Sequence, residues 1–166
     1  MGVQPDINAA TKAIADIADL ISQHADLSHG QATIITTAAQ WHELGFRADS
    51  DLPDWLAAGW LNPTLARAAA TAGLTPKQAA SAAEHALADD YLTWWERDDN
   101  PYAVHIAGEM GEAWEIYIDE TYPSLTRTNR YSFRDRTTFA VKAACSGLLT
   151  VNFPAFASRR RHAQVT

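Results

Sequence analysis

Three side chains that could bind a metal ion recur in a helix predicted from about residue 101 to residue 120. His105, Glu109 and Glu112 follow one another at four- and three-residue steps, which places them on one helical face, as in the carboxylate-bridged metal sites of helix bundles. Such sites need matching ligands from a second helix, and His85 with Asp89 offers only a weak partner pair. A helical metalloenzyme around His105 is therefore one alternative, and a solvated acidic face explains the same residues without any metal.

The carboxylates of this region also predict a charged binding surface. They lie along one side of the predicted helix and just before it, where they could stand in for nucleic-acid phosphates. Complementary charge would make association with a basic partner fast and sensitive to salt. We therefore expect a non-catalytic protein whose acidic body binds a protein partner, in its sharper form an inhibitor or regulator that mimics nucleic-acid charge. The predicted partner-binding residues are Glu109, Glu112, Glu115, Asp119, Glu120, Asp98 and Asp99, with Asp89 and Asp90 nearby.

Two adjacent tryptophans, Trp94 and Trp95, precede Asp98 and Asp99. Neighbouring residues on a helix point in different directions, so the two rings cannot share one face. They could line a ligand pocket or form the core where two long helices meet. We expect one of them to be exposed as an aromatic anchor for a protein partner, because tryptophan is enriched among the residues that dominate binding energy.

The charge of the chain is divided unevenly. Residues 1–126 hold 5 basic and 19 acidic side chains, a balance of −14, whereas residues 127–166 hold 8 basic and one acidic, a balance of +7. Such asymmetry indicates a charged partner at one end. Arginines interleaved with Tyr131 and Phe133 predict an alternative function, a regulator that binds nucleic acid. The possible nucleic-acid contacts are Arg127, Arg130, Arg134, Arg136, Arg159, Arg160 and Arg161.

The same arginines have a simpler interpretation. An acidic protein offers them carboxylates on its own body or on a neighbouring subunit, so they could serve as internal ion-pair partners. The pI of about 5.2 also argues against duplex binding by the whole domain, which usually presents a basic face.

Motifs for catalysis are missing from the sequence. It contains no phosphate-binding loop, dinucleotide fingerprint, nucleophile elbow or zinc-binding H-E-x-x-H. The one cysteine, Cys145, lies among alanines and is expected to be a small core residue. We therefore expect no enzyme activity, no cofactor and no bound metal. Without a signal peptide or an apolar run of about 18–20 residues, the chain is expected to be cytoplasmic and free of membrane. A short chain without motifs fits a phage or plasmid protein, and the sequence leaves a host regulator open as the alternative.

Helices are the elements that must position all these residues. Alanine, the best helix former, occupies 32 of the 166 positions, and long alternating β-branched runs are missing. A W/A-x-x-x-G repeat at residues 41–74 places Gly45, Gly59 and Gly73 at intervals of 14 residues, each before a large apolar residue. Glycine there permits the left-handed turn that ends a helix, and the next residue folds back on that helix. The repeat therefore predicts short helices joined by tight turns.

The predicted architecture is all-α, an irregular orthogonal bundle of about seven helices. The repeat forms a helix-turn-helix-like subdomain in its middle. Arg67, Lys77 and Gln78 are too few to read a DNA groove, so we expect its tryptophans to serve packing. Residues 1–153 are predicted to form a single helical domain and residues 154–166 a basic C-terminal tail.

Overall fold

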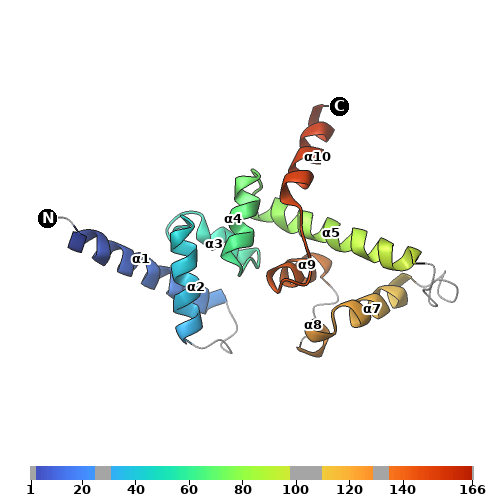
Figure 1. Ribbon diagram of the computed structural model, residues 1–166, viewed down its shortest axis with the longest axis horizontal. Helices are drawn as coiled ribbons and strands as arrows, with labels where there is room; N and C mark the ends of the chain where they lie inside the picture. Colours follow the sequence, from blue (N-terminus) through green and yellow to red (C-terminus); the bar gives the residue numbers. More distant parts are fainter. Residues whose placement is uncertain (1–2, 25–30, 98–109, 129–134, 166) are drawn as a thin grey trace. The chain divides into compact units, whose positions relative to one another are not determined.

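A computed structural model of the protein describes residues 3–24, 31–97, 110–128 and 135–165, and within them the side chains of residues 8–24, 33–97, 113–126 and 135–163. Within these residues the chain forms nine helices and no strand, which confirms the all-α class (Figure 1). One of them, α10, covers most of the segment that the sequence predicts as a C-terminal tail, and together with the short α8 it brings the number of described helices above the expected seven or so.

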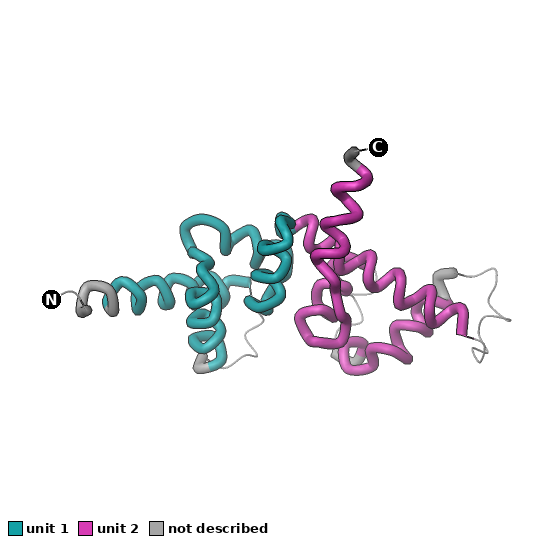
Figure 2. The backbone as a smooth tube through the Cα atoms, turned by 45° about the horizontal axis from the view of Figure 1, so that its top comes forward, with its two compact units in different colours: residues 1–76 teal, residues 77–166 magenta. Residues whose placement is uncertain are grey.

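The chain divides into two compact units, residues 1–76 and residues 77–166 (Figure 2). Each unit has its own buried residues, and we describe each by itself. The single domain over residues 1–153 that the sequence predicts stays a prediction, because compactness does not determine whether two units unfold together.

The first unit contains four helices, of which the first two pack along each other. Their contact buries Ile17 and Ile21 from one helix and Ala38 and Trp41 from the other. The spacing of these residues follows the helical period, so each helix presents an apolar stripe to its neighbour. The helices are α1 (Val3–His24), α2 (Gln31–Glu43), α3 (Leu52–Ala57) and α4 (Pro63–Thr71).

The glycine repeat forms the same turn three times. Gly45, Gly59 and Gly73 have φ of 91°, 94° and 86°. After each glycine, the next backbone N–H donates to the carbonyl five residues earlier, as from Phe46 to Trp41 at 3.1 Å. This is the Schellman geometry, in which the apolar residue after the glycine folds back onto the helix. The structure confirms the predicted turns. Gly147 (φ 77°) repeats the turn after α9, a site that the sequence pattern missed.

The folded-back residues build the core of the first unit. The Trp41 and Phe46 rings meet edge to face at 4.7 Å, and the chain of rings continues through Trp55 to Trp60. Trp60 has no exposed surface, and its Nε1–H donates to the carbonyl of Pro76 at 3.3 Å. Each repeat therefore supplies one turn and one piece of core, which is the packing role expected for these tryptophans.

Substitution of Gly73 by alanine tests the backbone requirement. Apart from Gly73 and its two chain neighbours, no residue has an atom within 4 Å of the position that a Cβ would occupy, so the cost comes from the left-handed backbone alone. We expect Gly73→Ala to lower the free energy of unfolding by about 1–2 kcal/mol, measured by urea denaturation. Gly73→Asn is the control, because asparagine adopts this conformation more readily and should lose less.

The second unit is built around α5. Its first half contacts α9 and α10, because Thr137 donates to Glu84 at 2.7 Å and the ring of His85 packs on Phe156 at 5.3 Å. Its second half contacts α7 through aromatic side chains. The helices of this unit are α5 (Pro76–Glu96), α7 (Met110–Thr121), α8 (Pro123–Thr128), α9 (Arg136–Cys145) and α10 (Phe153–Val165).

The helices α8 and α10 each have a proline in the first turn. Pro123 follows the end of α7 and opens α8, since proline is tolerated in the first turn of a helix. Residues 154–165, predicted as a basic tail, form most of α10. The side chain of Asn152 caps α10 by accepting from the backbone N–H of Ala155 at 3.1 Å. Burial of Phe153 then attaches the helix to its unit.

Asp135 makes the stability of α9 depend on pH. Its carboxylate accepts from the Thr138 hydroxyl at 2.7 Å and from the Thr138 N–H at 3.2 Å, and these bonds lower the pKa of Asp135. Because the folded pKa is below the unfolded one, this stabilisation is present above the unfolded pKa and is lost as the pH falls through the folded pKa. We expect Asp135→Ala to cost about 1 kcal/mol at neutral pH and to cost less in acid. Asp135→Asn, which retains a cap without a charge, should remove the pH dependence, as read from urea denaturation at several pH values.

Candidate protein-binding surface

Aromatic side chains join the second half of α5 to α7. The ring of Tyr91 lies 5.0 Å from Trp114 and 5.2 Å from Tyr117, and Trp94 lies 5.5 Å from Tyr117. The cluster continues through Tyr122 to Phe139 of α9. These contacts pack the two helices against each other and leave charged residues on their outer sides.

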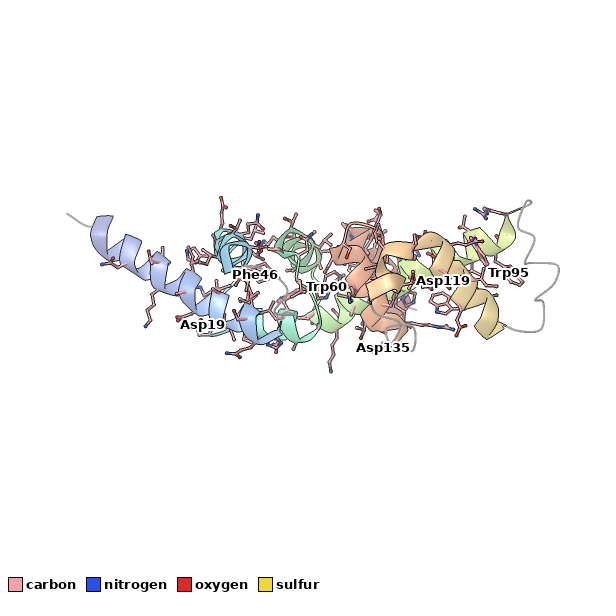
Figure 3. The ribbon with its side chains drawn as sticks, turned by 90° about the horizontal axis from the view of Figure 1, so that it is seen from below. Asp19, Phe46, Trp60, Trp95, Asp119 and Asp135 are labelled. Carbon is pink, nitrogen blue, oxygen red and sulfur yellow. The ribbon has the colours of Figure 1, made fainter. Side chains whose placement is uncertain are left out.

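The two adjacent tryptophans have different environments. Trp94 is buried, with 5% of its surface exposed, in the contact of α5 with α7. Its Nε1–H donates to Glu120 Oε2 at 3.1 Å, so Glu120, predicted as a partner contact, already has a bonding role inside the unit. Trp95 is half-buried at the end of α5 (Figure 3). Of the two tryptophans, Trp95 is therefore the one that could act as the aromatic anchor, and this role stays a prediction.

Two predicted partner-binding residues lie on the outer side of α7. Glu115 and Asp119 are exposed and one helical turn apart (Asp119 in Figure 3). Among the described residues, neither carboxylate forms an ion pair or a hydrogen bond. The sequence of α7 contains no lysine or arginine, so no cation on the helix itself offsets their charge. We call Glu115 and Asp119 the α7 acidic stripe.

The outer side of α5 adds negative charge and an apolar side chain. Asp89 and Glu96 are exposed, and Leu92 between them leaves 52% of its surface exposed. Partial burial, and then the neighbouring charge of Asp89, raise the pKa of Asp90. The ionised form of Asp90 is therefore disfavoured in the protein alone, and a cation nearby would favour it again.

A guanidinium already lies on one ring of the aromatic cluster. Arg136 Cζ is 4.7 Å from the centre of the Trp114 ring, within the range of a cation–π contact. Arg136 is the first residue of α9, where a positive charge opposes the helix dipole. The attraction between the guanidinium and the Trp114 ring offsets this unfavourable interaction with the helix dipole.

The same cluster encloses a polar atom without a partner. The hydroxyl of Tyr117 is buried and makes no hydrogen bond with the described residues. Burial, and then the neighbouring hydroxyl of Tyr122, raise the pKa of Tyr117. Both effects keep this hydroxyl neutral, so the cluster contributes no negative charge of its own to the acidic residues around it.

Other predicted residues lie outside the described part of the chain. They are Asp98, Asp99, His105, Glu109, Arg130 and Arg134, together with the side chains of Glu112 and Arg127. The His105 cluster that predicts a metal site therefore falls there too. Within the described residues, no three or more histidine, cysteine or acidic side chains gather closely enough to hold a metal ion. His85 donates from Nδ1 to the carbonyl of Ser81 at 2.8 Å.

The remaining predicted arginines are gathered on α10. Arg159 and Arg161 are exposed, and Arg160 lies 5.9 Å from the ring of Phe156. We call Arg159, Arg160 and Arg161 the arginine turn. None of the three pairs with a carboxylate among the described residues, so the internal ion pairs that the sequence allows are not seen in this part of the structure.

The first unit carries a separate groove that the sequence did not indicate. It has a volume of about 530 Å³ and lies between α1 and the Gly45 turn. Its lining includes Asp16, His42, Arg47 and Asp49 beside small apolar side chains. The small side chains of the α1 alanines leave room for this groove. The sequence did not indicate it, because alanines in a helix do not reveal which part of the chain will lie opposite them.

Comparison with known proteins finds no matching family model, no matching curated protein and no matching solved structure. The described helices include none that is both long and apolar enough to cross a bilayer. The inference of function therefore rests on the surfaces of this chain.

Proposed function

We propose that the protein is a non-catalytic binding protein whose α7 acidic stripe engages a basic protein partner. In the sharper form of the proposal it is an inhibitor or regulator, and its carboxylates occupy a surface on the partner that otherwise binds nucleic acid. The observation that carries the proposal is that Glu115 and Asp119 are exposed on a helix without any cation and have no partner among the described residues.

The surroundings of the stripe support this proposal. A protein interface combines charge at its rim with apolar and aromatic contacts at its centre. Leu92 and Trp95 on α5 offer partly exposed apolar surface, and the aromatic cluster packs α5 against α7.

A capture and competition experiment tests the proposal. Immobilised protein is incubated with extract of the source cell, treated with nuclease and washed at low and at high salt. We expect a basic protein that survives nuclease and is released by high salt, because salt screens exposed charges. Added duplex DNA should displace this protein from the acidic surface. Capture that disappears with nuclease would contradict the proposal.

A second candidate function follows from the arginine turn. We propose as the alternative that α10 contacts nucleic-acid phosphates, since Arg159 and Arg161 are exposed and without ion pairs to described residues. Arginine is suited to such contacts because its planar donors bind phosphate at two points.

Salt titration tests this alternative. If Arg159 and Arg161 each neutralise a phosphate, then Arg159→Gln with Arg161→Gln should weaken binding to a DNA oligonucleotide. The slope of log affinity against log salt should become shallower by about 2. Arg47→Gln with Arg67→Gln, two exposed arginines of the first unit, is the matched control. An unchanged slope would remove the arginine turn from nucleic-acid binding.

We also propose that the repeat at residues 41–74 is a helix-turn-helix-like scaffold within an irregular orthogonal bundle and does not read DNA. Its three tryptophans are buried, so their rings stabilise the unit. The exposed basic residues of this part, Arg47 and Arg67 in the repeat and Lys77 just after it, are too few to recognise a base sequence.

A further inference from the structure

The two oppositely charged surfaces of the second unit belong to the same chain and do not meet within it. The arginine turn lies on α10, whose sequence contains no acidic residue, and the α7 acidic stripe lies on a helix without lysine or arginine. Among the described residues, neither surface has an ion pair. Within the described residues, each surface therefore lacks a partner of the charge that the other carries.

The fold of the unit separates these two surfaces. α10 is attached to the first half of α5 by the contact of Phe156 with His85, whereas α7 contacts α5 at Tyr91 and Trp94. A helix rises 1.5 Å per residue, so the attachment points at His85 and Trp94 are about 14 Å apart along α5. From its attachment α10 leads away from α7 (Figures 1 and 2). The arginine turn therefore lies on a helix that leads away from the acidic stripe of the same chain.

We infer that the arginine turn of one copy docks on the α7 acidic stripe of a second copy. In the absence of the basic partner, the occupant of the stripe is thus another molecule of the same chain. The inference rests on the proposed function in that the same stripe is the binding surface, for which the two occupants compete. The contact joins two different patches, so two copies can close it reciprocally about a two-fold axis or extend it head to tail.

The chemistry of the two surfaces supports this pairing. Glu115 and Asp119 are four residues apart, which places their Cβ atoms about 5–6 Å apart. The three arginines fall within one turn of α10 and can form paired N–H···O bonds with these carboxylates. The surface of this unit also accepts guanidinium on an aromatic ring, as the contact of Arg136 with Trp114 demonstrates. Half-exposed Trp95 offers a further ring to an incoming arginine.

Sedimentation equilibrium of charge-reversal variants tests the inference. At low salt the average mass of the wild type should rise above 18.2 kDa with increasing protein concentration, and it should return to that value at high salt. We expect E115K/D119K and R159E/R161E each to weaken self-association about tenfold or more. An equimolar mixture of the two variants should associate again, because each supplies the surface that the other lacks. A chain that carries all four substitutions should also associate.

Matched controls reverse the same number of charges on exposed residues of the first unit. D19K/E43K and R47E/R67E should associate like the wild type, and helical circular dichroism should confirm that every variant is folded. A wild type that stays monomeric at low salt would overturn the inference, as would a mixture that does not associate. Neither result would contradict the proposed function. That proposal is contradicted if the capture experiment retains no basic protein.

Discussion

Trp60→Ala is expected to lower the free energy of unfolding by about 3–5 kcal/mol, the range for truncating a large buried aromatic residue. Trp60 has no exposed surface, and its ring belongs to the row of aromatic contacts that the repeat turns create. Alanine would leave a cavity and would free the Pro76 carbonyl that accepts from Trp60 Nε1 at 3.3 Å. Urea denaturation followed by circular dichroism measures the loss.

Trp60→Phe is the control for this prediction. Phenylalanine retains most of the buried ring and lacks only the N–H donor, so it should cost clearly less than alanine. Equal stability of Trp60→Ala and the wild type would show that the repeat does not form the core of the first unit.

The same variant tests the single domain predicted over residues 1–153. If the two units unfold as one, hydrogen exchange in α4 and in α5 should accelerate together in Trp60→Ala. Faster exchange in α4 alone would show that the two units unfold independently.

Reversing the α7 acidic stripe is expected to have the largest effect on binding. E115K/D119K should weaken the affinity for a basic partner about tenfold or more, since it replaces attraction by repulsion at two positions. The loss should be greatest at low salt and should shrink as salt screens the charges. Both residues are exposed and have no bond to the described part of the chain, so stability should change by less than about 0.5 kcal/mol.

D19K/E43K is the matched control for the stripe, because it makes the same change in charge on exposed residues of the first unit. If a partner binds this control and the stripe variant with equal affinity, its affinity depends on net charge. The α7 acidic stripe would then not be the binding surface. Isothermal titration with the purified partner distinguishes the two outcomes.

Local signals in the sequence account for the part of the fold that could be predicted. The turns at Gly45, Gly59 and Gly73 were predictable because a left-handed glycine followed by an apolar residue is a short-range motif. The cap of α4 is an equally local feature, because the side chain of Asn62 accepts from the N–H of Leu65 at 3.2 Å. The helical class followed from alanine content and spacing for the same reason.

Tertiary contacts decide what the sequence left open. α10 looked like a tail because its arginines follow no apolar period, and its attachment depends on Phe153 and on the contact of Phe156 with His85. The pattern indicated that Trp94 and Trp95 cannot share a face, yet only the position of α7 decides that Trp94 is the buried one. Glu120 was predicted as a partner-binding residue. Its hydrogen bond to Trp94 joins residues far apart in the sequence, so no local pattern could indicate it.

The candidate surface was therefore predictable in kind but not in detail. Acidic residues at helical spacing indicated a charged face, and Glu115 and Asp119 do lie exposed on one helix. The sequence could not indicate that the arginine turn would remain without carboxylate partners in the described structure, because distant parts of the chain meet or miss each other only in the fold.

The most direct test of the central claim is quantitative capture from nuclease-treated extract of the source cell. Wild type, E115K/D119K and D19K/E43K are immobilised in equal amounts, and the proteins retained at low salt are identified by mass spectrometry. The acidic-stripe account predicts that wild type and D19K/E43K retain the same basic, nucleic-acid-binding protein and that E115K/D119K loses it. Equal retention by all three, or retention of no such protein by the wild type, would contradict the account.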